Sequence, residues 1–279
     1  MMTFKDFYKD FLQRMENARQ KANTKEFQSL MYVVEPDWKS EEQYLFAEYC
    51  QNKAGLFALF GENLSMDDWM QKALQFSSRE MFTHIYFKWI LLYWHQLKAL
   101  KDPSKIEANF SSIYNISEQA IKNEKDYHNQ MAFKSTFVLS LAALGKHAEA
   151  EAEMLSLSYK PLSPQLVNNK EKLVYFFANI YKMLIAALEI RSEACLTKIL
   201  QMITIDDFLM NSPSPLFRKF NQIVMDLADI RPELAADFNY FYEMRKKWSG
   251  FLPNFSLFSM MIEEENTKGL ELFFGALND

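Results

Sequence analysis

The chain has 279 residues, only 6 of them glycine and 8 proline, and its formal net charge at pH 7 is −5. Sheet proteins and nucleotide-binding α/β folds need glycines at turns and phosphate loops, so this composition argues against both classes. A net negative surface has no general attraction to nucleic acid or anionic membranes, but it suits a basic protein partner. Hydrophobic residues make up 49% of the chain, enough for a large core.

The sequence also predicts the cellular compartment of the protein. The N-terminal segment MMTFKDFYKDF alternates charged and aromatic residues and lacks the apolar core of a signal peptide. The most apolar stretch, Ile85–Leu97, carries Lys88 and His95 and is shorter than the roughly 20 residues that span a bilayer. Cys50 and Cys195 lie far apart in helical patterns, as two buried thiols would. We expect a cytoplasmic protein.

Apolar residues recur at positions i, i+3, i+4 and i+7 along most of the chain, which predicts amphipathic helices with short connections. The helix at 80–100 is apolar on nearly every side, so we expect it to be the most buried element of the N-terminal half. The expected helices, in chain order, are 4–21, 24–31, 40–60, 65–74, 80–100, 102–121 (with a break near Asn115), 130–144, 148–157, 167–191, 194–203, 216–230, 232–248 and 256–274.

Short polar motifs predict where several of these helices begin. Ser40 followed by Gln43, and Ser65 followed by Asp68, have the spacing of capping boxes. Asp102-Pro103 has the residues of an N-cap and a first helical position. Thr24 is the expected cap of the short second helix, and Gly61 the residue that ends the third.

A helical hairpin is expected at residues 130–161. Gly145 ends its first helix in the position where a left-handed backbone is usually needed, and a three-residue turn makes the two helices antiparallel. The run Leu144–Ala150 resembles the turn of a tetratricopeptide repeat, which also often has a proline where Pro161 stands. Val138 departs from that pattern, because the repeat has a small residue in the middle of its first helix. The resemblance implies helical-hairpin architecture over about one repeat.

We therefore predict an all-α fold of stacked antiparallel helical hairpins, tetratricopeptide-like or α-solenoid-like, with about a dozen helices. Pro161 and Pro164 mark the clearest linker. We expect an N-terminal helical-hairpin region at 1–160 and a C-terminal helical region at 161–279, packed as one continuous unit.

Two Glu-x-x-x-His pairs, Glu80 with His84 and Glu124 with His128, have the spacing of neighbours on a helix face and are candidate metal ligands. Carboxylate-bridged bundles use Glu-x-x-His instead, so surface salt links are the favoured interpretation. The adjacent acids Asp67-Asp68 and Asp206-Asp207 are interpreted as helix-start residues. No nucleophile stands in a catalytic context and no phosphate loop is present, so we expect no enzyme, metal or cofactor.

Acidic clusters are the main surface signal. The first comprises Glu149, Glu151 and Glu153, and the second comprises Glu263, Glu264 and Glu265. Each is a solvated helix face or a docking surface for a basic protein, where complementary charge speeds association. We take both clusters as candidate partner-binding sites.

The segment 44–79 resembles the all-α immunity protein 49 family of bacterial polymorphic toxin systems. The matching residues are Ala54-Gly55-Leu56-Phe57-Ala58-Leu59, followed by Trp69, Ala73 and Arg79. The resemblance implies a non-enzymatic protein that binds and neutralises a toxin, often a nuclease. Our leading hypothesis is such an immunity protein with a basic toxin domain as partner. The alternatives are a tetratricopeptide-type regulatory or scaffold module, recognised by a groove of Asn and Lys from successive first helices, and a helical metal protein or enzyme using the Glu/His pairs.

Overall fold

The computed structural model describes residues 3–100, 102–158 and 189–204, together with residues 179, 182, 183, 186 and 187. The chain divides into two compact units, residues 1–112 and 113–279. The described residues form helices and no strand, which confirms the all-α prediction for this part of the chain. The expected count of about a dozen helices, the solenoid-like stacking and the boundary near residue 160 stay predictions.

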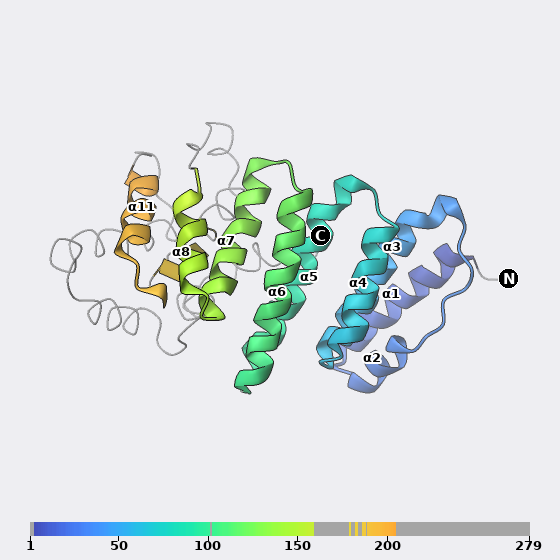
Figure 1. Cartoon of the computed structure of the whole chain (residues 1–279). Helices are drawn as coiled ribbons and strands as arrows, with labels where there is room; N and C mark the ends of the chain where they lie inside the picture. Colours follow the sequence, from blue (N-terminus) through green and yellow to red (C-terminus); the bar gives the residue numbers. More distant parts are fainter. Residues whose placement is uncertain are drawn as a thin grey trace. The chain divides into compact units, whose positions relative to one another are not determined.

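Nine α-helices lie within the described residues (Figure 1). They are α1 (Phe4–Gln20), α2 (Thr24–Met31), α3 (Gln43–Leu59), α4 (Asn63–Gln75), α5 (Phe82–Ala99), α6 (Pro103–Asn123), α7 (Tyr127–Ala143), α8 (His147–Ser156) and α11 (Glu193–Thr204). Short 3₁₀ turns at Ser40–Glu42 and Arg79–Met81 precede α3 and α5. None of these described helices is long and apolar enough to cross a membrane.

Local capping explains several helix starts. Asp102 accepts the backbone N–H of Ser104 at 3.0 Å, as its pairing with Pro103 predicts. Asn23, one residue before the predicted Thr24, caps α2 by accepting the N–H of Glu26. The helix-ending glycines are also confirmed, because Gly61 and Gly145 have φ values of 74° and 72°.

Two predicted capping boxes are wrong. The helix expected at Ser65 begins at Asn63, so Ser65 and Asp68 lie inside α4. At the start of α3, residues 40–42 form a 3₁₀ turn in place of the first α-helical turn. There the carboxylate of Glu42 accepts the backbone N–H of Lys39 at 3.1 Å, and it also accepts that of Lys5 in α1 at 3.2 Å. A carboxylate that caps two helices at once is not visible in the local spacing of either. The break expected near Asn115 is absent too, since α6 runs continuously.

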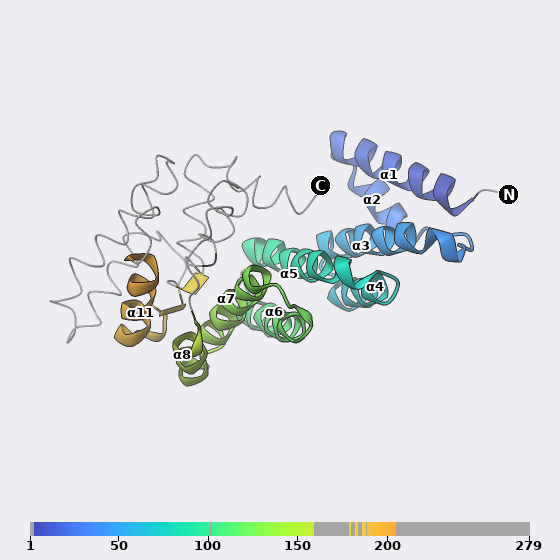
Figure 2. The same ribbon diagram turned by 90° about the horizontal axis from the view of Figure 1, so that it is seen from above.

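Helix α3 is the centre of the first unit. It contacts α1, α2, α4 and α5 (Figures 1 and 2) and has ten buried residues, whereas eight are described for α5. The expectation that 80–100 would be the most buried element is therefore wrong. An all-round apolar sequence shows that α5 must be covered, but the number of neighbouring helices decides how completely.

The core of the first unit is aromatic. The fully buried ring of Tyr49 lies 4.9 Å from Phe11 of α1 and 5.8 Å from Trp69 of α4, measured between ring centroids. Both contacts are edge-on, the arrangement that the quadrupoles of aromatic rings favour. The same core holds the free thiol of Cys50, and Cys195 of the second unit is also a buried free thiol, as expected.

Lys53 is a buried cation in this aromatic core, with 2% of its surface exposed. Its ammonium donates to the carbonyl of Val33 at 2.7 Å and to the Tyr49 hydroxyl at 3.1 Å. It also lies 5.4 Å from the ring centroid of Trp69. Burial lowers the pKa of Lys53 to about 8, and the nearby Glu35 carboxylate opposes part of that shift.

The lowered pKa of Lys53 predicts a specific dependence of stability on pH. Above pH 8 the folded protein has lost the Lys53 proton, whereas the unfolded chain keeps it up to about pH 10.4. The Lys53 contribution to the unfolding free energy should therefore rise between these values, by up to about 1.4 kcal/mol per pH unit. Urea unfolding of wild type and Lys53→Met at several pH values between 7.5 and 10 measures this difference.

The comparison with Lys53→Met is needed because other groups titrate in the same range. Burial raises the pKa of Cys50 to about 12, which lowers stability with rising pH in both proteins. The control Lys9→Met removes an exposed lysine of α1 and should follow the wild-type curve. A constant difference between wild type and Lys53→Met across the range would contradict the lowered pKa.

Trp89 of α5 is predicted to be a large contributor to stability. Its side chain is 4% exposed, and its Nε1–H donates to the Asp67 carboxylate at 2.7 Å. Trp89→Ala should lower the unfolding free energy by about 3–5 kcal/mol, because it leaves a large cavity. Trp89→Phe keeps most of the volume and should cost about 1–2 kcal/mol through the lost hydrogen bond. A loss below about 1 kcal/mol for Trp89→Ala in urea unfolding would be inconsistent with this burial.

Candidate functional site

The hairpin of α7 and α8 carries the first predicted acidic cluster. Asp126 caps α7 by accepting the N–H groups of His128 and Asn129, each at 3.0 Å. Gly145 then reverses the chain, and the Lys146 N–H donates to the carbonyl of Leu141 at 2.9 Å. The two helices pack against each other, as the sequence predicts.

Helix α8 is buried on one side only. Ala150 and Met154 face the interior, with 0% and 1% of their surface exposed. The opposite side is centred on three exposed apolar residues, Ala148, Ala152 and Leu155. At 100° per residue, these three form a narrow strip along the helix.

The three acidic residues of α8 flank this strip on different sides. Glu149 and Glu153 are exposed and one helical turn apart, so they share one edge of it. The ammonium of Lys146 lies 3.9 Å from the Glu149 carboxylate, a weak exposed ion pair. Glu151 lies on the other edge and is half-buried. The cluster therefore does not form a single acidic face.

Glu151 has a structural role. Its Oε1 accepts a hydrogen bond from the hydroxyl of Ser192, whose own oxygen accepts the backbone N–H of Cys195 at 3.2 Å. This arrangement places a carboxylate next to the N-terminal end of α11, where the helix dipole favours negative charge. Lys198 of α11 adds a second connection by donating to the carbonyl of Leu155. The other predicted cluster, Glu263, Glu264 and Glu265, lies outside the described residues, as does Asp206-Asp207.

Neither Glu-x-x-x-His pair lies on one α-helix, so the face predicted from their spacing does not form. Glu80 is in a 3₁₀ turn and His84 is in α5, where burial, followed by the nearby Lys88, lowers the pKa of the imidazole. Glu124 lies between α6 and α7, and its carboxylate accepts the backbone N–H groups of Lys125 and Asp126 at 2.8 Å. Within the described residues there is no group of three or more His, Cys, Asp or Glu that could hold a metal ion.

The interpretation of Asp67 as a helix-start residue is wrong, because Asp67 lies within α4. Its carboxylate accepts hydrogen bonds from the Trp89 indole and, at 2.8 Å, from the Tyr93 hydroxyl. Burial raises the pKa of Asp67, and the two hydrogen bonds oppose that rise. Asp67 therefore joins α4 to α5.

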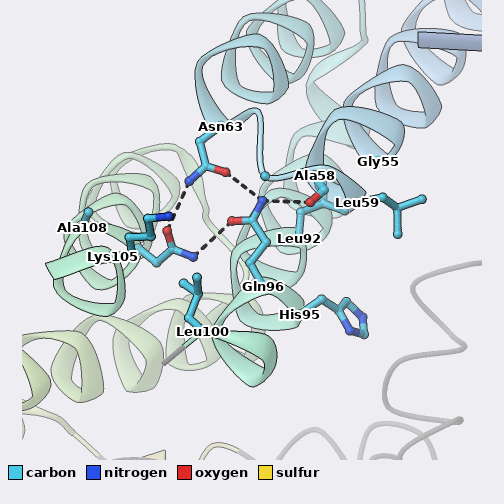
Figure 3. Close-up of a pocket in the computed structure, with 12 residues that line it drawn as sticks. Gly55, Ala58, Leu59, Asn63, Leu92, His95, Gln96, Leu100, Lys105 and Ala108 are labelled. Atoms are coloured by element: carbon cyan, nitrogen blue, oxygen red, sulfur yellow. Dashed lines mark hydrogen bonds between the residues drawn. The ribbon is translucent and has the colours of Figure 1, made fainter. Parts of the chain in front are cut away.

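A cleft of about 700 Å³ in the first unit was not predicted. It lies at α3, the start of α4, α5 and the first turns of α6 (Figure 3). One wall is a closed ring of three side-chain amides. Gln96 donates to Asn63 at 2.7 Å, Asn63 donates to Asn109 at 3.2 Å, and Asn109 donates back to Gln96 at 3.1 Å. Gln96 also donates to the carbonyl of Ala58 at 3.1 Å.

The amide ring could not be found from the sequence, because its members are 13 to 46 residues apart and follow no motif. A tetratricopeptide-type groove is expected to be lined by Asn and Lys from successive first helices. The cleft also contains Asn and Lys, but Asn63 begins α4, and Asn109 and Lys105 lie in α6. These residues therefore do not come from the first helices of successive hairpins.

Comparison of the chain with protein-family models, with curated proteins and with solved structures finds no match. The resemblances to tetratricopeptide repeats and to the immunity protein 49 family therefore stay predictions.

The amide ring predicts that the fold is destabilised when Gln96 is replaced by a side chain that can only accept hydrogen bonds. Gln96→Glu should lower the unfolding free energy by about 2–3 kcal/mol at pH 7, because two donated hydrogen bonds are replaced by facing oxygen atoms. At pH 4 the loss should shrink, since a protonated carboxyl donates one of these bonds. Gln119→Glu, the same change at an exposed position of α6, is the control in urea unfolding. Equal losses for the two variants would show that the ring does not stabilise the fold.

Proposed function

We propose that this chain is a non-enzymatic protein that binds another protein, and that it acts as an immunity protein against a basic toxin domain. The exposed side of α8 is the observation that carries the proposal. It combines a strip of exposed apolar residues with carboxylates on both edges.

The chemistry of α8 suits a protein partner. Small side chains such as Ala148 and Ala152 let a partner's backbone approach closely, and Leu155 offers an exposed apolar contact, 42% accessible. Carboxylates at the edge of such a strip attract a basic partner over the Debye length, about 8 Å at physiological salt. Edge charges of this kind act mainly on the association rate.

Two connections fix α8 as a rigid surface. The Glu151–Ser192 hydrogen bond and the Lys198–Leu155 hydrogen bond both join it to α11. A preorganised surface loses less conformational entropy when it binds, which favours affinity. Glu151 thus supports the surface, and Glu149 and Glu153 supply the charge that a partner meets.

A tetratricopeptide-type scaffold is the second candidate, favoured by the α7–α8 hairpin and its turn at Gly145. Both candidates bind proteins, and they differ in the partner. An immunity protein should bind a toxin domain encoded by a neighbouring gene, and co-expression should protect cells from that domain. Toxicity that co-expression leaves unchanged would favour the scaffold.

The charge hypothesis predicts a specific loss of association rate. Glu149→Gln/Glu153→Gln should lower the on-rate for the toxin domain about 3- to 10-fold at low salt and flatten its salt dependence, because Gln keeps the side-chain length and removes the charge. The unfolding free energy should change by less than about 0.5 kcal/mol, since both residues are exposed. Surface plasmon resonance at several salt concentrations measures the rate.

Two controls separate this effect from net charge and from packing. Glu107→Gln/Glu118→Gln removes an equal number of negative charges, two, but from α6. This variant should leave the on-rate near that of wild type. Glu151→Gln should instead lower the stability, because it removes the negative charge beside the start of α11. If the α8 and α6 double variants behaved alike, acidic docking on α8 would be wrong.

A further inference from the structure

The geometry points to the cleft of the first unit as a binding site for a small amphipathic anion, with an apolar body and one acidic group. This inference is independent of the α8 surface and of the function proposed for it. The cleft, at about 700 Å³, is within the range of about 300–1,000 Å³ that small-molecule sites occupy.

Gly55 is the first observation. It lies inside α3, where glycine costs about 1 kcal/mol relative to alanine. A helix-interior glycine usually has a packing reason or a functional reason. Packing does not require it here, because a Cβ at Gly55 would meet no atom of the described chain within 4 Å. Since Gly55 lines the cleft, the missing side chain widens this space and lets a ligand reach the helix backbone.

The charges that line the cleft are the second observation. Its ionisable lining residues are His95 and Lys105, and none of the 12 lining residues is acidic, although the chain as a whole has a net charge of −5. Asp102, one turn before Lys105, is not among these lining residues. Its carboxylate accepts the N–H and the hydroxyl of Ser104, at 3.0 and 2.8 Å, and also interacts electrostatically with Lys105. The cleft therefore presents basic groups to an anion, and Figure 3 shows Lys105 on the side of the amide ring and His95 on the other side.

The apolar lining is the third observation. Leu59, Leu92 and Leu100 contribute side chains, and Leu59 is 66% exposed. Covering such a side chain with an apolar ligand is favourable by about 25 cal/mol for each Å² removed from water. The amide ring gives the ligand a rigid polar wall, because its three members hold one another by hydrogen bonds. A monoanion with an aliphatic or aryl body matches all three observations.

Equilibrium dialysis of the full chain with decanoate, decan-1-ol and decylammonium tests the inference. These probes have the same carbon chain and differ in the charge of the head group. We expect decanoate to bind saturably at one site, decanol to bind at least about 5-fold more weakly, and decylammonium not to bind measurably. Such a 5-fold preference is what one exposed charge pair of up to about 1 kcal/mol supplies.

Two variants locate the site. Gly55→Leu fills the cleft and should lower the affinity for decanoate at least about 10-fold, while leucine, a better helix former than glycine, preserves α3. Lys105→Met should remove the preference for decanoate over decanol. Lys122→Met, which removes an exposed lysine near the other end of α6, should change neither quantity. Thermal unfolding of each variant confirms that it is folded.

Four results would overturn the inference. The first is no saturable binding of decanoate by the wild-type chain. The second is binding that a folded Gly55→Leu leaves unchanged, which would place the probe elsewhere. The third is equal binding of all three probes, which would remove the anionic class of ligand. The fourth is an unchanged preference for decanoate over decanol in Lys105→Met, which would show that the acidic group does not lie at Lys105.

Discussion

The side chain of Tyr49 is the contact on which the packing of the first unit depends. Its ring meets aromatic rings of α1 and α4, and its hydroxyl donates to Glu35 at 3.3 Å and accepts from Lys53. Apolar burial drives the helices together but is non-directional, so many relative rotations of α3 would bury similar areas. Hydrogen bonds are directional, and a buried polar group that loses its partner costs about 1–3 kcal/mol. The Tyr49 hydroxyl therefore selects one rotation of α3. Through Glu35, it also joins the segment that precedes α3 to the core.

The part of the fold that could be predicted is the part that local interactions determine. A helix is specified by a 3.6-residue period and by groups within four residues of its ends, which is why α1, the Asp102-Pro103 start of α6 and the Gly145 turn could be predicted. The failures have the opposite origin. Glu42 caps the turn at its own position and also α1, through Lys5, which is 37 residues away. Asp67 bonds to groups 22 and 26 residues away, so no local pattern distinguishes these two acids from ordinary surface acids.

The candidate sites show the same limit. Counting acids in α8 predicted one cluster of three, but the helix geometry separates Glu149 and Glu153 from Glu151. The spacing of two residues between Glu149 and Glu151 already indicates different faces, whereas the partner of Glu151 could not be predicted. Ser192 is 41 residues away, and its local contact is with the backbone N–H of Cys195 at the start of α11. A capping serine can receive a backbone N–H and donate its own proton to a carboxylate, and only the tertiary structure brings that carboxylate near.

Some unusual residues in these helices are explained by the fold, and others are not. Gly145 has a left-handed backbone that other residues adopt at a cost, and Lys53, although buried, satisfies a carbonyl and a hydroxyl, so the fold itself accounts for both. Gly55 is different, because alanine would favour α3 more and a Cβ at this position would meet no described atom within 4 Å. Gly55 lies one helical turn from the exposed Leu59, and both residues line the same cleft. A glycine that packing does not require, at a cleft lined by His95, Lys105 and no acid, is the feature that the ligand proposed for this space would explain.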